Sequence, residues 1–271
     1  GDKTVTGVGF QPNFGFFLYE NGSSTGAIVR ANLGLGFAVS QAKQFTMCWG
    51  IDDGATMTAT IDAVSYTNSS NYISFITDGA ETIDVLAAFG TAGNPTGWNS
   101  DGWDYNISNA SATNNTRLFY LVIKGGQWDV GTTTLPTASG TRTISGMAFQ
   151  PKAVGMALAH ATADATVTIH ATSSFGAAAS TSTEATANAR QSDAILNTAV
   201  FRTTLSTEMI STGGAAVGLS LTSLNSDGWT GTDTGVDAAY QAGWFAMGDA
   251  PSAALTVSVS DNLNNLADAI T

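Results

Sequence analysis

The chain has 271 residues, of which 43% are hydrophobic and only 11% are charged, and its formal net charge is −12. The nine lysines and arginines are scattered, which argues against nucleic acid as the partner, because phosphate binding needs grouped basic residues. No apolar run is long enough to span a membrane as a helix, and the single cysteine, Cys48, excludes an internal disulfide and is expected to be buried.

The first half of the chain has the pattern of a series of short strands. β-Branched and aromatic residues alternate with turns rich in Gly, Asn, Asp and Pro, and 3.6-residue periodicity is almost absent. The expected strands are 4–10, 14–19, 27–37, 45–49, 57–66, 72–76, 82–89 and 118–124.

The second half follows the same plan. Its expected strands are 143–147, 153–161, 167–172, 194–204, 215–221 and 241–247, and a stretch of small residues at 176–189 takes the place of 34–43. Near the end, 255–259 alternates like a strand, and Ser260-Asp261 could cap a short helix with Leu263, Leu266 and Ile270 on one face.

Two phrases recur in the same order. Thr4 to Pro12 (TVTGVGFQP) returns as Thr143 to Pro151 (TISGMAFQP), and Asn-Ser-Asp-Gly-Trp occurs at 99–103 and at 225–229. The first pair is offset by 139 positions and the second by 126, so the second copy is about 13 residues shorter inside. The simplest account is that the first copy has an extra hairpin strand near 72–76.

This repeat predicts two tandem antiparallel β-sandwich domains of jelly-roll-like form, at 1–130 and 141–250, with a C-terminal arm at 251–271. The linker is expected at 130–140, around Leu135-Pro136. The arm is too small to be stable alone, so it docks on its own domains or reaches a neighbouring subunit, and we favour the neighbour. Leu263, Leu266 and Ile270 are its candidate assembly contacts.

The Asp-Gly-Trp triplets at Asp101, Gly102, Trp103 and at Asp227, Gly228, Trp229 are interpreted as structural marks of the repeat. Asp bonds local backbone amides, Gly adopts unusual backbone angles, and Trp begins the next strand and plugs the end of the sandwich. The functional alternative is a sugar platform on an exposed indole, for which Trp49, Trp98, Trp128 and Trp229 are the candidates.

No residue pattern predicts a catalytic or metal site. Acidic turns at Asp52-Asp53-Gly54 and at Asp227, Asp233 and Asp237 lack the spacing of an EF-hand loop. His160 and His170 flank 162–165, which has the pattern of a hairpin turn, and two histidines alone make a poor zinc site. A hydrolase with two converging acids is a third option, but nothing singles out a pair. We therefore expect no catalytic residue, no metal and no cofactor.

The repeated phrases resemble a β-sandwich repeat found in structural proteins of tailed bacteriophages and related prophage regions. The residues that carry the resemblance are Thr4–Pro12, Ser100–Trp103 and 120–126, then Thr143–Pro151, Ser226–Trp229 and 244–248, while 13–15 depart from it. Residues 256–263 also look like segments that end phage virion proteins.

The resemblance implies a non-enzymatic virion protein on the outer surface of the capsid or tail, as a decoration or tail component. It would act by assembly with copies of itself and other virion proteins, as a trimer by analogy, without nucleic acid or membrane as a partner. The alternative is an adhesin that binds host-surface glycans on the same scaffold.

Overall fold

The computed structural model describes residues 1–21, 30–52, 63–76, 83–109, 116–135, 137–191, 198–203, 207–210, 216–235, 238–249 and 256–260. All regular structure in these residues is β-strand, arranged in antiparallel sheets, which confirms the predicted all-β class and fits a sandwich layout. Within the same residues, no helix has the length and apolar character needed to cross a membrane.

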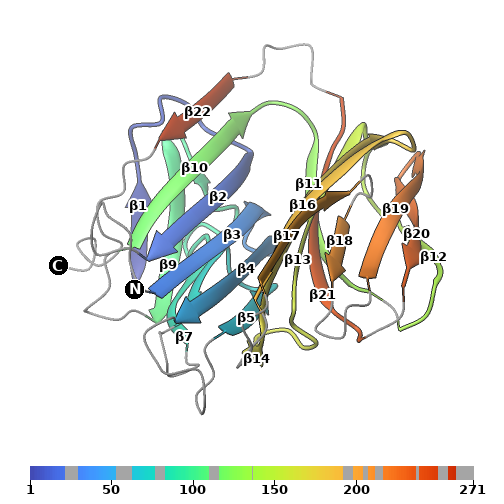
Figure 1. Cartoon of the computed structure of the whole chain (residues 1–271). Helices are drawn as coiled ribbons and strands as arrows, with labels where there is room; N and C mark the ends of the chain where they lie inside the picture. The colour runs from blue at the N-terminus through green and yellow to red at the C-terminus, as the bar shows by residue number, and fades with distance from the viewer. Residues whose placement is uncertain are drawn as a thin grey trace.

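The described strands form four sheets, which we name by their place in the stack (Figure 1). Outer sheet one contains β1 (Asp2–Val5), β9 (Gly102–Asn109), β7 (Ile83–Phe89) and β6 (Ile73–Ile76) in that order, with β8 (Trp98–Asn99) also paired to β9. Inner sheet one has the order β14 (Thr168–Ile169), β5 (Ala63–Asn68), β4 (Lys43–Asp52), β3 (Arg30–Ser40), β2 (Phe14–Asn21), β10 (Thr116–Lys124) and β22 (Thr256–Ser260).

The other two sheets are built from the second half of the chain together with β11. Inner sheet two has the order β11 (Trp128–Thr134), β21 (Gln241–Met247), β13 (Ala153–Ala159), β15 (Ala171–Ser180), β16 (Thr183–Gln191) and β17 (Thr198–Thr203). Outer sheet two has the order β12 (Gly140–Ile144), β20 (Gly228–Thr234), β19 (Ala216–Asn225) and β18 (Thr207–Ile210). The strands at 14–21, 73–76, 83–89, 116–124, 153–159 and 241–247 lie close to their predicted positions.

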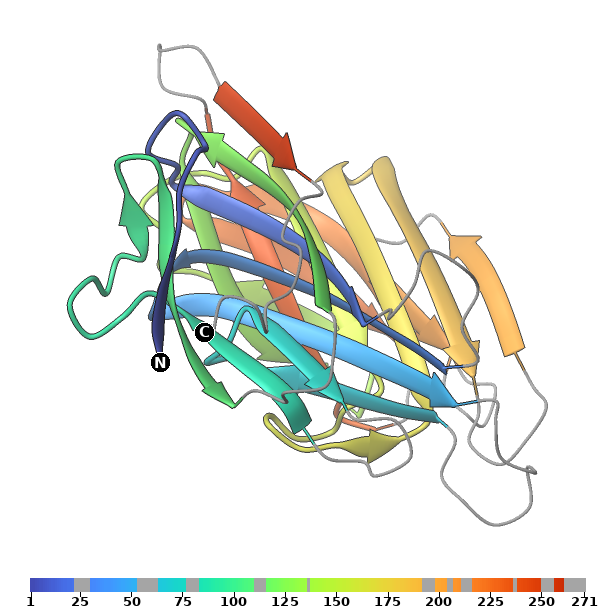
Figure 2. The same ribbon diagram turned by 90° about the vertical axis from the view of Figure 1, so that its left-hand side faces the viewer.

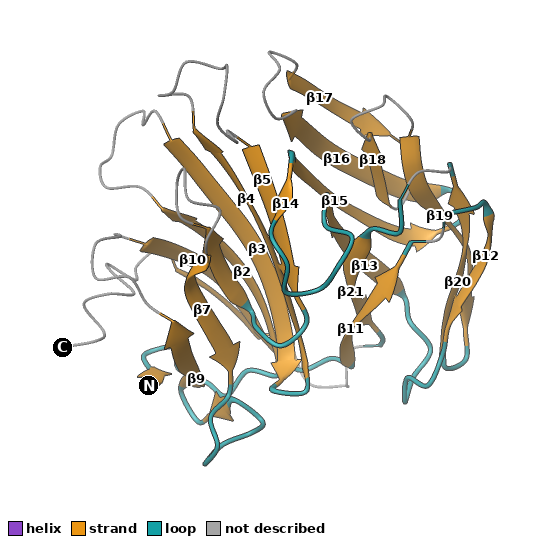
Figure 3. Cartoon of the chain, turned by 90° about the horizontal axis from the view of Figure 1, so that it is seen from below, coloured by secondary structure: helices purple, strands orange, loops and turns teal. Residues whose placement is uncertain are grey.

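Each outer sheet packs on its inner sheet, and the two inner sheets pack on each other (Figures 2 and 3). This stacking explains why the inner strands lack clear alternation in the sequence. On β10, Tyr120 and Val122 belong to the core under outer sheet one, whereas Leu121 and Ile123 belong to the core between the inner sheets. A strand that is covered on both faces carries apolar residues at successive positions.

Large side chains from inner sheet one meet small residues of inner sheet two. The ring of Phe45 lies against Gly243, where an added Cβ would come within 2.1 Å of the ring. Phe37 packs edge-on to Phe245 at a ring-centroid distance of 5.3 Å, and Ala157 is fully buried in the same layer. The Gly and Ala content of the second half therefore provides room for the aromatic residues of the first half, as close packing requires.

The strands β11 and β22 cross between the two halves of the chain. β11 follows β10 in sequence but pairs with β21, and β22 follows β21 but pairs with β10. The linker prediction for 130–140 is wrong at its start, because Trp128–Thr134 is a paired strand. The division at 130 and 250 into two domains stays a prediction, and strand pairing crosses both predicted boundaries.

The extra hairpin strand predicted near 72–76 is also wrong, because β6 has a counterpart in β18. β6 pairs with β7 at one end of outer sheet one, and β18 pairs with β19 at one end of outer sheet two. Part of the length difference lies in the connection that precedes the Asp-Gly-Trp turn. In the first half, residues 90–97 separate Phe89, which pairs with Tyr105, from Trp98, which pairs with Trp103. In the second half, only residues 222–223 separate Leu221, which pairs with Gly231, from Leu224, which pairs with Trp229.

The predicted hairpin turn at 162–165 instead reaches inner sheet one. The backbone N–H of Ala165 donates to the Thr67 carbonyl at 2.8 Å, and the Asp164 carboxylate accepts from the backbone N–H of Ser69 at 3.0 Å. β14 then pairs with β5. This excursion is a second place where chain from the second half extends a sheet of the first half.

Candidate functional site

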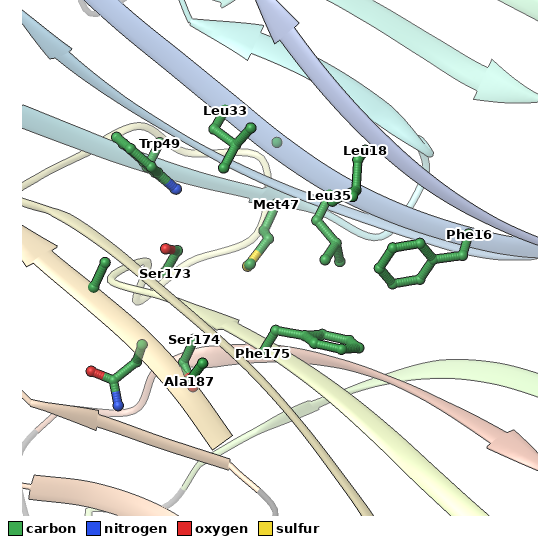
Figure 4. A pocket seen from close by; sticks show the side chains of 13 residues that line it. Phe16, Leu18, Leu33, Leu35, Met47, Trp49, Ser173, Ser174, Phe175 and Ala187 are labelled. Atoms are coloured by element: carbon green, nitrogen blue, oxygen red, sulfur yellow. The ribbon is translucent and has the colours of Figure 1, made fainter. Parts of the chain in front are cut away.

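An apolar groove opens where the two inner sheets diverge, and it is the main cavity of interest in the described structure (Figure 4). Its volume is about 480 Å³. The wall from inner sheet one is built of large side chains, whereas the wall from inner sheet two is built mostly of small ones. The lining includes Phe16, Leu18, Leu33, Leu35, Met47 and Trp49 on the first wall and Ser173, Phe175, Ala187 and Ala189 on the second.

An apolar row crosses four strands on the face of inner sheet one that forms the first wall, and it extends past the groove to Phe119. Phe119 of β10 lies opposite Leu18 of β2, Leu18 lies opposite Leu35 of β3, and Leu35 lies opposite Met47 of β4. Directly paired residues in antiparallel strands project from the same face, so their side chains form one surface. Phe119 and Leu18 are each 39% exposed and Leu33 is 42% exposed. This is a contiguous patch of exposed large hydrophobic residues rather than scattered single ones.

The groove stays open because the second wall consists of short side chains. Ala187 is exposed and Ala189 is half-buried, and neither side chain is long enough to fill the space next to Trp49 and Leu33. Deeper between the sheets the ring of Phe175 closes the gap, with its centroid 5.5 Å from that of Phe16. The groove is therefore the part of the inter-sheet layer that the chain's own described side chains do not fill.

None of the described residues that line the groove carries a charge. On the same sheet, Glu20 pairs with Leu33 across β2 and β3, and the guanidinium of Arg117 is 3.6 Å from the Glu20 carboxylate. This ion pair is partly exposed and marks the polar limit of the apolar row. An apolar occupant suits such a lining, because a charged one would lose its water without gaining a partner.

The first Asp-Gly-Trp turn is tied to the start of the chain. The Asp101 carboxylate accepts from the backbone N–H groups of Gly7 at 2.8 Å and Gly9 at 2.5 Å, and these two bonds lower the pKa of Asp101. Gly7 and Gly9 have φ values of +90° and +83°, so β1 ends at Val5 instead of continuing to residue 10 as predicted. Here the repeated motif forms a turn that clasps β1.

The glycines of the motif are required by close approach of the backbone. An added Cβ on Gly102 would lie 2.2 Å from the Val5 carbonyl oxygen, and one on Gly228 would lie 1.9 Å from that of Ile144. The two turns also share a backbone contact, in which the Asp101 carbonyl accepts from the Val8 N–H at 3.0 Å and the Asp227 carbonyl accepts from the Met147 N–H at 2.9 Å. Both turns hold the first strand of their half against β9 or β20.

The two motif tryptophans are fully buried, but their indole N–H groups differ. Trp103 Nε1 donates to the hydroxyl of Tyr72 at 3.2 Å. Trp229 Nε1 has no hydrogen-bond partner among the described residues. Tyr72 lies just before β6. The core under outer sheet one therefore provides a partner for the indole N–H, whereas the core under outer sheet two provides none among the described residues.

The acids with shifted pKa values all make structural contacts. Asp104 is partly desolvated, which raises its pKa, but hydrogen bonds from Asn94, Asn99 and Thr4 outweigh this effect and lower it. Burial raises the pKa of Asp233, and its ion pair with Arg142 opposes that shift.

Within the described residues, no three His, Cys, Asp or Glu side chains are grouped as a metal would require. Asp53, Gly54 and Asp237, three of the acidic-turn residues considered from the sequence, lie outside the described residues. Cys48 is buried, and its pKa is raised to about 12 by that burial.

His160 and His170 are neighbours, as their spacing suggested. Their ring centroids are 5.2 Å apart with the rings almost perpendicular, and His160 Nε2 lies 3.1 Å from the hydroxyl of Tyr240. The pair sits beside the chain excursion that carries β14 to inner sheet one. The contacts link β13, the excursion and the start of β21 rather than forming an open site.

The four tryptophans considered for sugar stacking are mostly covered. Trp98 is 7% exposed and Trp229 is fully buried. Trp128 stacks on Phe14 with ring centroids 4.2 Å apart and an interplanar angle of 12°, which covers one of its faces. Trp49 is half-buried in the apolar groove.

The groove itself was not predicted. The candidate assembly contacts Leu263, Leu266 and Ile270 lie outside the described residues. The available sequence signal for the groove was the near-continuous apolar character of 14–19 and 118–123, which indicates strands covered on both faces. Comparison of the chain with protein-family models, with curated proteins and with solved structures found no match.

Proposed function

We propose that this chain is a structural protein of a tailed-phage virion, displayed on the outer surface of the capsid or the tail, and that it acts by assembly. The sequence resemblance supplies the class of protein. The observation that carries the proposal is the group of exposed apolar side chains Phe119, Leu18 and Leu33 beside a groove whose described lining is uncharged. Exposed apolar patches of this kind mark contact surfaces between proteins.

In this proposal, neighbouring copies of the chain cover the groove, other virion proteins are further partners, and the trimer rests on analogy alone. The low charge of the chain supports it, because subunit contacts that bury few charges avoid a large desolvation cost. A non-catalytic role is part of the same proposal. Its support is that Asp101, Asp104 and Asp233 are occupied by turns, hydrogen bonds and an ion pair.

The glycan-binding alternative has less support from the same side chains. Stacking on a sugar needs an indole face open to solvent, and Trp98 and Trp229 are buried. Trp49 is half-buried in a groove whose described lining is mostly apolar, with Ser173, Ser174 and Asn188 as its polar members. We therefore do not propose a second function.

Electron microscopy of particles tests the proposal. Antibodies against the purified chain, visualised with gold, should label capsids or tails of the phage or induced prophage that encodes it. Particles from a strain with the gene deleted supply the control. Unlabelled wild-type particles, in a lysate where the chain is abundant, would overturn the proposal.

A Leu33→Asp substitution puts a charge into the groove and probes its role. Leu33 is 42% exposed, so the folded chain tolerates the charge at this position better than in its core. We expect the variant chain to fold but to enter particles at a reduced level. Wild-type incorporation of this variant would show that the groove is not an assembly contact.

A further inference from the structure

The crossing of β11 and β22 is reciprocal and occurs in equivalent register. Ile123 of β10 and Met247 of β21 hold equivalent positions. Ile123 pairs with the first residue of β2, and Met247 pairs with the first residue of β13. β22 places Val257 opposite Ile123, and β11 places Trp128 opposite Met247. Each closing strand therefore accepts, on its outer edge, the strand that follows the closing strand of the other half.

The described contacts show how the first crossing strand, β11, is held in its sheet. β11 is joined to described strands at both of its ends and is anchored by side chains. Trp128 stacks on Phe14, Val130 is 3% exposed, and Asp129 forms an ion pair with Lys43 of β4 at 2.5 Å. Separation of β11 from its sheet would require exposing this part of the inter-sheet core.

β22 and β11 each pair with one strand at the edge of a sheet, and β22 is the shorter of the two. It has five residues and pairs with one strand, β10, at the edge of inner sheet one, as Figure 1 shows. Only residues 250–255 join it to the preceding described segment. A short edge strand that is hydrogen-bonded on one side opens at a small fraction of the cost of global unfolding.

We propose that β22 is exchanged between copies of this chain, so that Thr256–Ser260 of one copy completes inner sheet one of another. The acceptor is the outer edge of β10, and the partner is a second copy. The exchanged and unexchanged forms contain the same strand pairing, which is why exchange of an identical element is a low-cost route to association. Residues 250–255 can span about 20 Å, at roughly 3.3–3.6 Å per extended residue.

This inference deepens the proposed assembly function, because it names the strand and the partner through which copies connect. A high concentration of the chain favours the exchanged form. At low concentration β22 pairs with β10 of its own chain, because the two strands are covalently connected. The sequence of β22, Thr-Val-Ser-Val-Ser, contains neither charge nor proline, two common devices that protect edge strands from pairing with other chains.

Cysteine pairs in full-length chains test the exchange. One chain carries Leu121→Cys and a size tag, and the other carries Val259→Cys, at positions that face each other across β10 and β22. The chains are mixed, incubated, oxidised and separated without reductant. A second pair, Val122→Cys with Ser258→Cys, covers the other of the two alternating types of antiparallel pair. The buried Cys48 can remain.

The expected result is a disulfide-linked heterodimer whose yield rises with protein concentration and incubation time. A matched control uses Thr134→Cys with Gln241→Cys, which face each other across β11 and β21. Because β11 is anchored, at least tenfold less heterodimer is expected from this control. A chain with both Leu121→Cys and Val259→Cys reports pairing within one copy.

Two outcomes would overturn the inference. In the first, the doubly substituted chain closes its internal disulfide but mixed single variants give no heterodimer with either pair. In the second, the double variants form no disulfide at all, which would show that β22 does not pair with β10. Cross-linking together with unlabelled virions would overturn only the virion proposal, and labelled virions without cross-linking would overturn only the exchange.

Discussion

Removal of the Tyr72 hydroxyl tests whether the buried indole of Trp103 depends on it. Tyr72 and Trp103 are both fully buried, and Trp103 Nε1 donates to the Tyr72 hydroxyl at 3.2 Å. Tyr72→Phe keeps the ring, which packs edge-on against Phe17 at a centroid distance of 4.7 Å. The substitution therefore removes one acceptor and leaves a buried N–H without a partner.

Loss of one partner of a buried hydrogen bond costs about 1–3 kcal/mol, because the remaining group has given up its water. Tm falls by about 2–4 °C for each kcal/mol in proteins of 150–250 residues, so a decrease of roughly 2–12 °C is expected. Urea unfolding followed by tryptophan fluorescence gives the free energy, and calorimetry gives Tm. Tyr105→Phe is the matched control, as Tyr105 lies in the same core and no indole N–H depends on it in the described contacts.

A double-mutant cycle makes the test specific. In a Trp103→Phe background there is no indole N–H, so the further substitution Tyr72→Phe should cost clearly less than it does in the wild-type chain. Equal costs in the two backgrounds would refute the hydrogen-bond argument. So would a Tyr72→Phe variant with wild-type stability.

Three further predictions address the motif, the inter-sheet ion pair and pH. Gly228→Ala places a Cβ 1.9 Å from a carbonyl oxygen of β12 and should lower the free energy of unfolding by about 1–3 kcal/mol, whereas Gly140→Ala meets no atom within 4 Å and should be nearly neutral in urea unfolding. Lys43→Met leaves the Asp129 carboxylate, whose side chain is 8% exposed, without its cation. Urea unfolding should show that the free energy of unfolding falls by about 1–3 kcal/mol, which is less than for a fully buried pair because Lys43 is half-exposed. An unchanged midpoint would contradict the anchoring of β11. Asp101 has a lowered pKa in the folded state, so its stabilising contribution is present above its unfolded pKa and is lost as pH falls through its folded pKa. Asp101→Asn should therefore make Tm less dependent on pH from about pH 5 downward, and an identical pH profile would contradict this.

Much of the secondary structure could be predicted, but the partners of several strands could not. The outer strand β9 alternates between buried Trp103, Tyr105 and Ile107 and more exposed polar residues, so its type and its inward face follow from its sequence. Residues 130–134 belong to the strand β11, yet their local sequence predicts the start of a linker. Their status as a strand depends on the free edge of β21, which lies more than a hundred positions away in the sequence.

The candidate site was less predictable for a related reason. Leu18 and Leu33 have the same apolar character as residues that are fully buried, such as Phe17 on the same strand as Leu18. Only the divergence of the inner sheets leaves them exposed. The candidate tryptophans Trp98 and Trp229 show the opposite outcome, since both are buried. Their burial depends on the sheets packed over them, and the local sequence does not indicate that packing.

The amino-acid sequence by itself determined the β-class, the positions of most strands and the repeated Asp-Gly-Trp turn, since alternation, turn residues and close-approach glycines act over a few neighbouring residues. The tertiary structure decided that inner strands are covered on both faces, that an apolar groove remains between them, and that β11 and β22 cross to the opposite half. These features depend on which sheet edge is free and how two surfaces fit, and both are set by residues far apart in the chain.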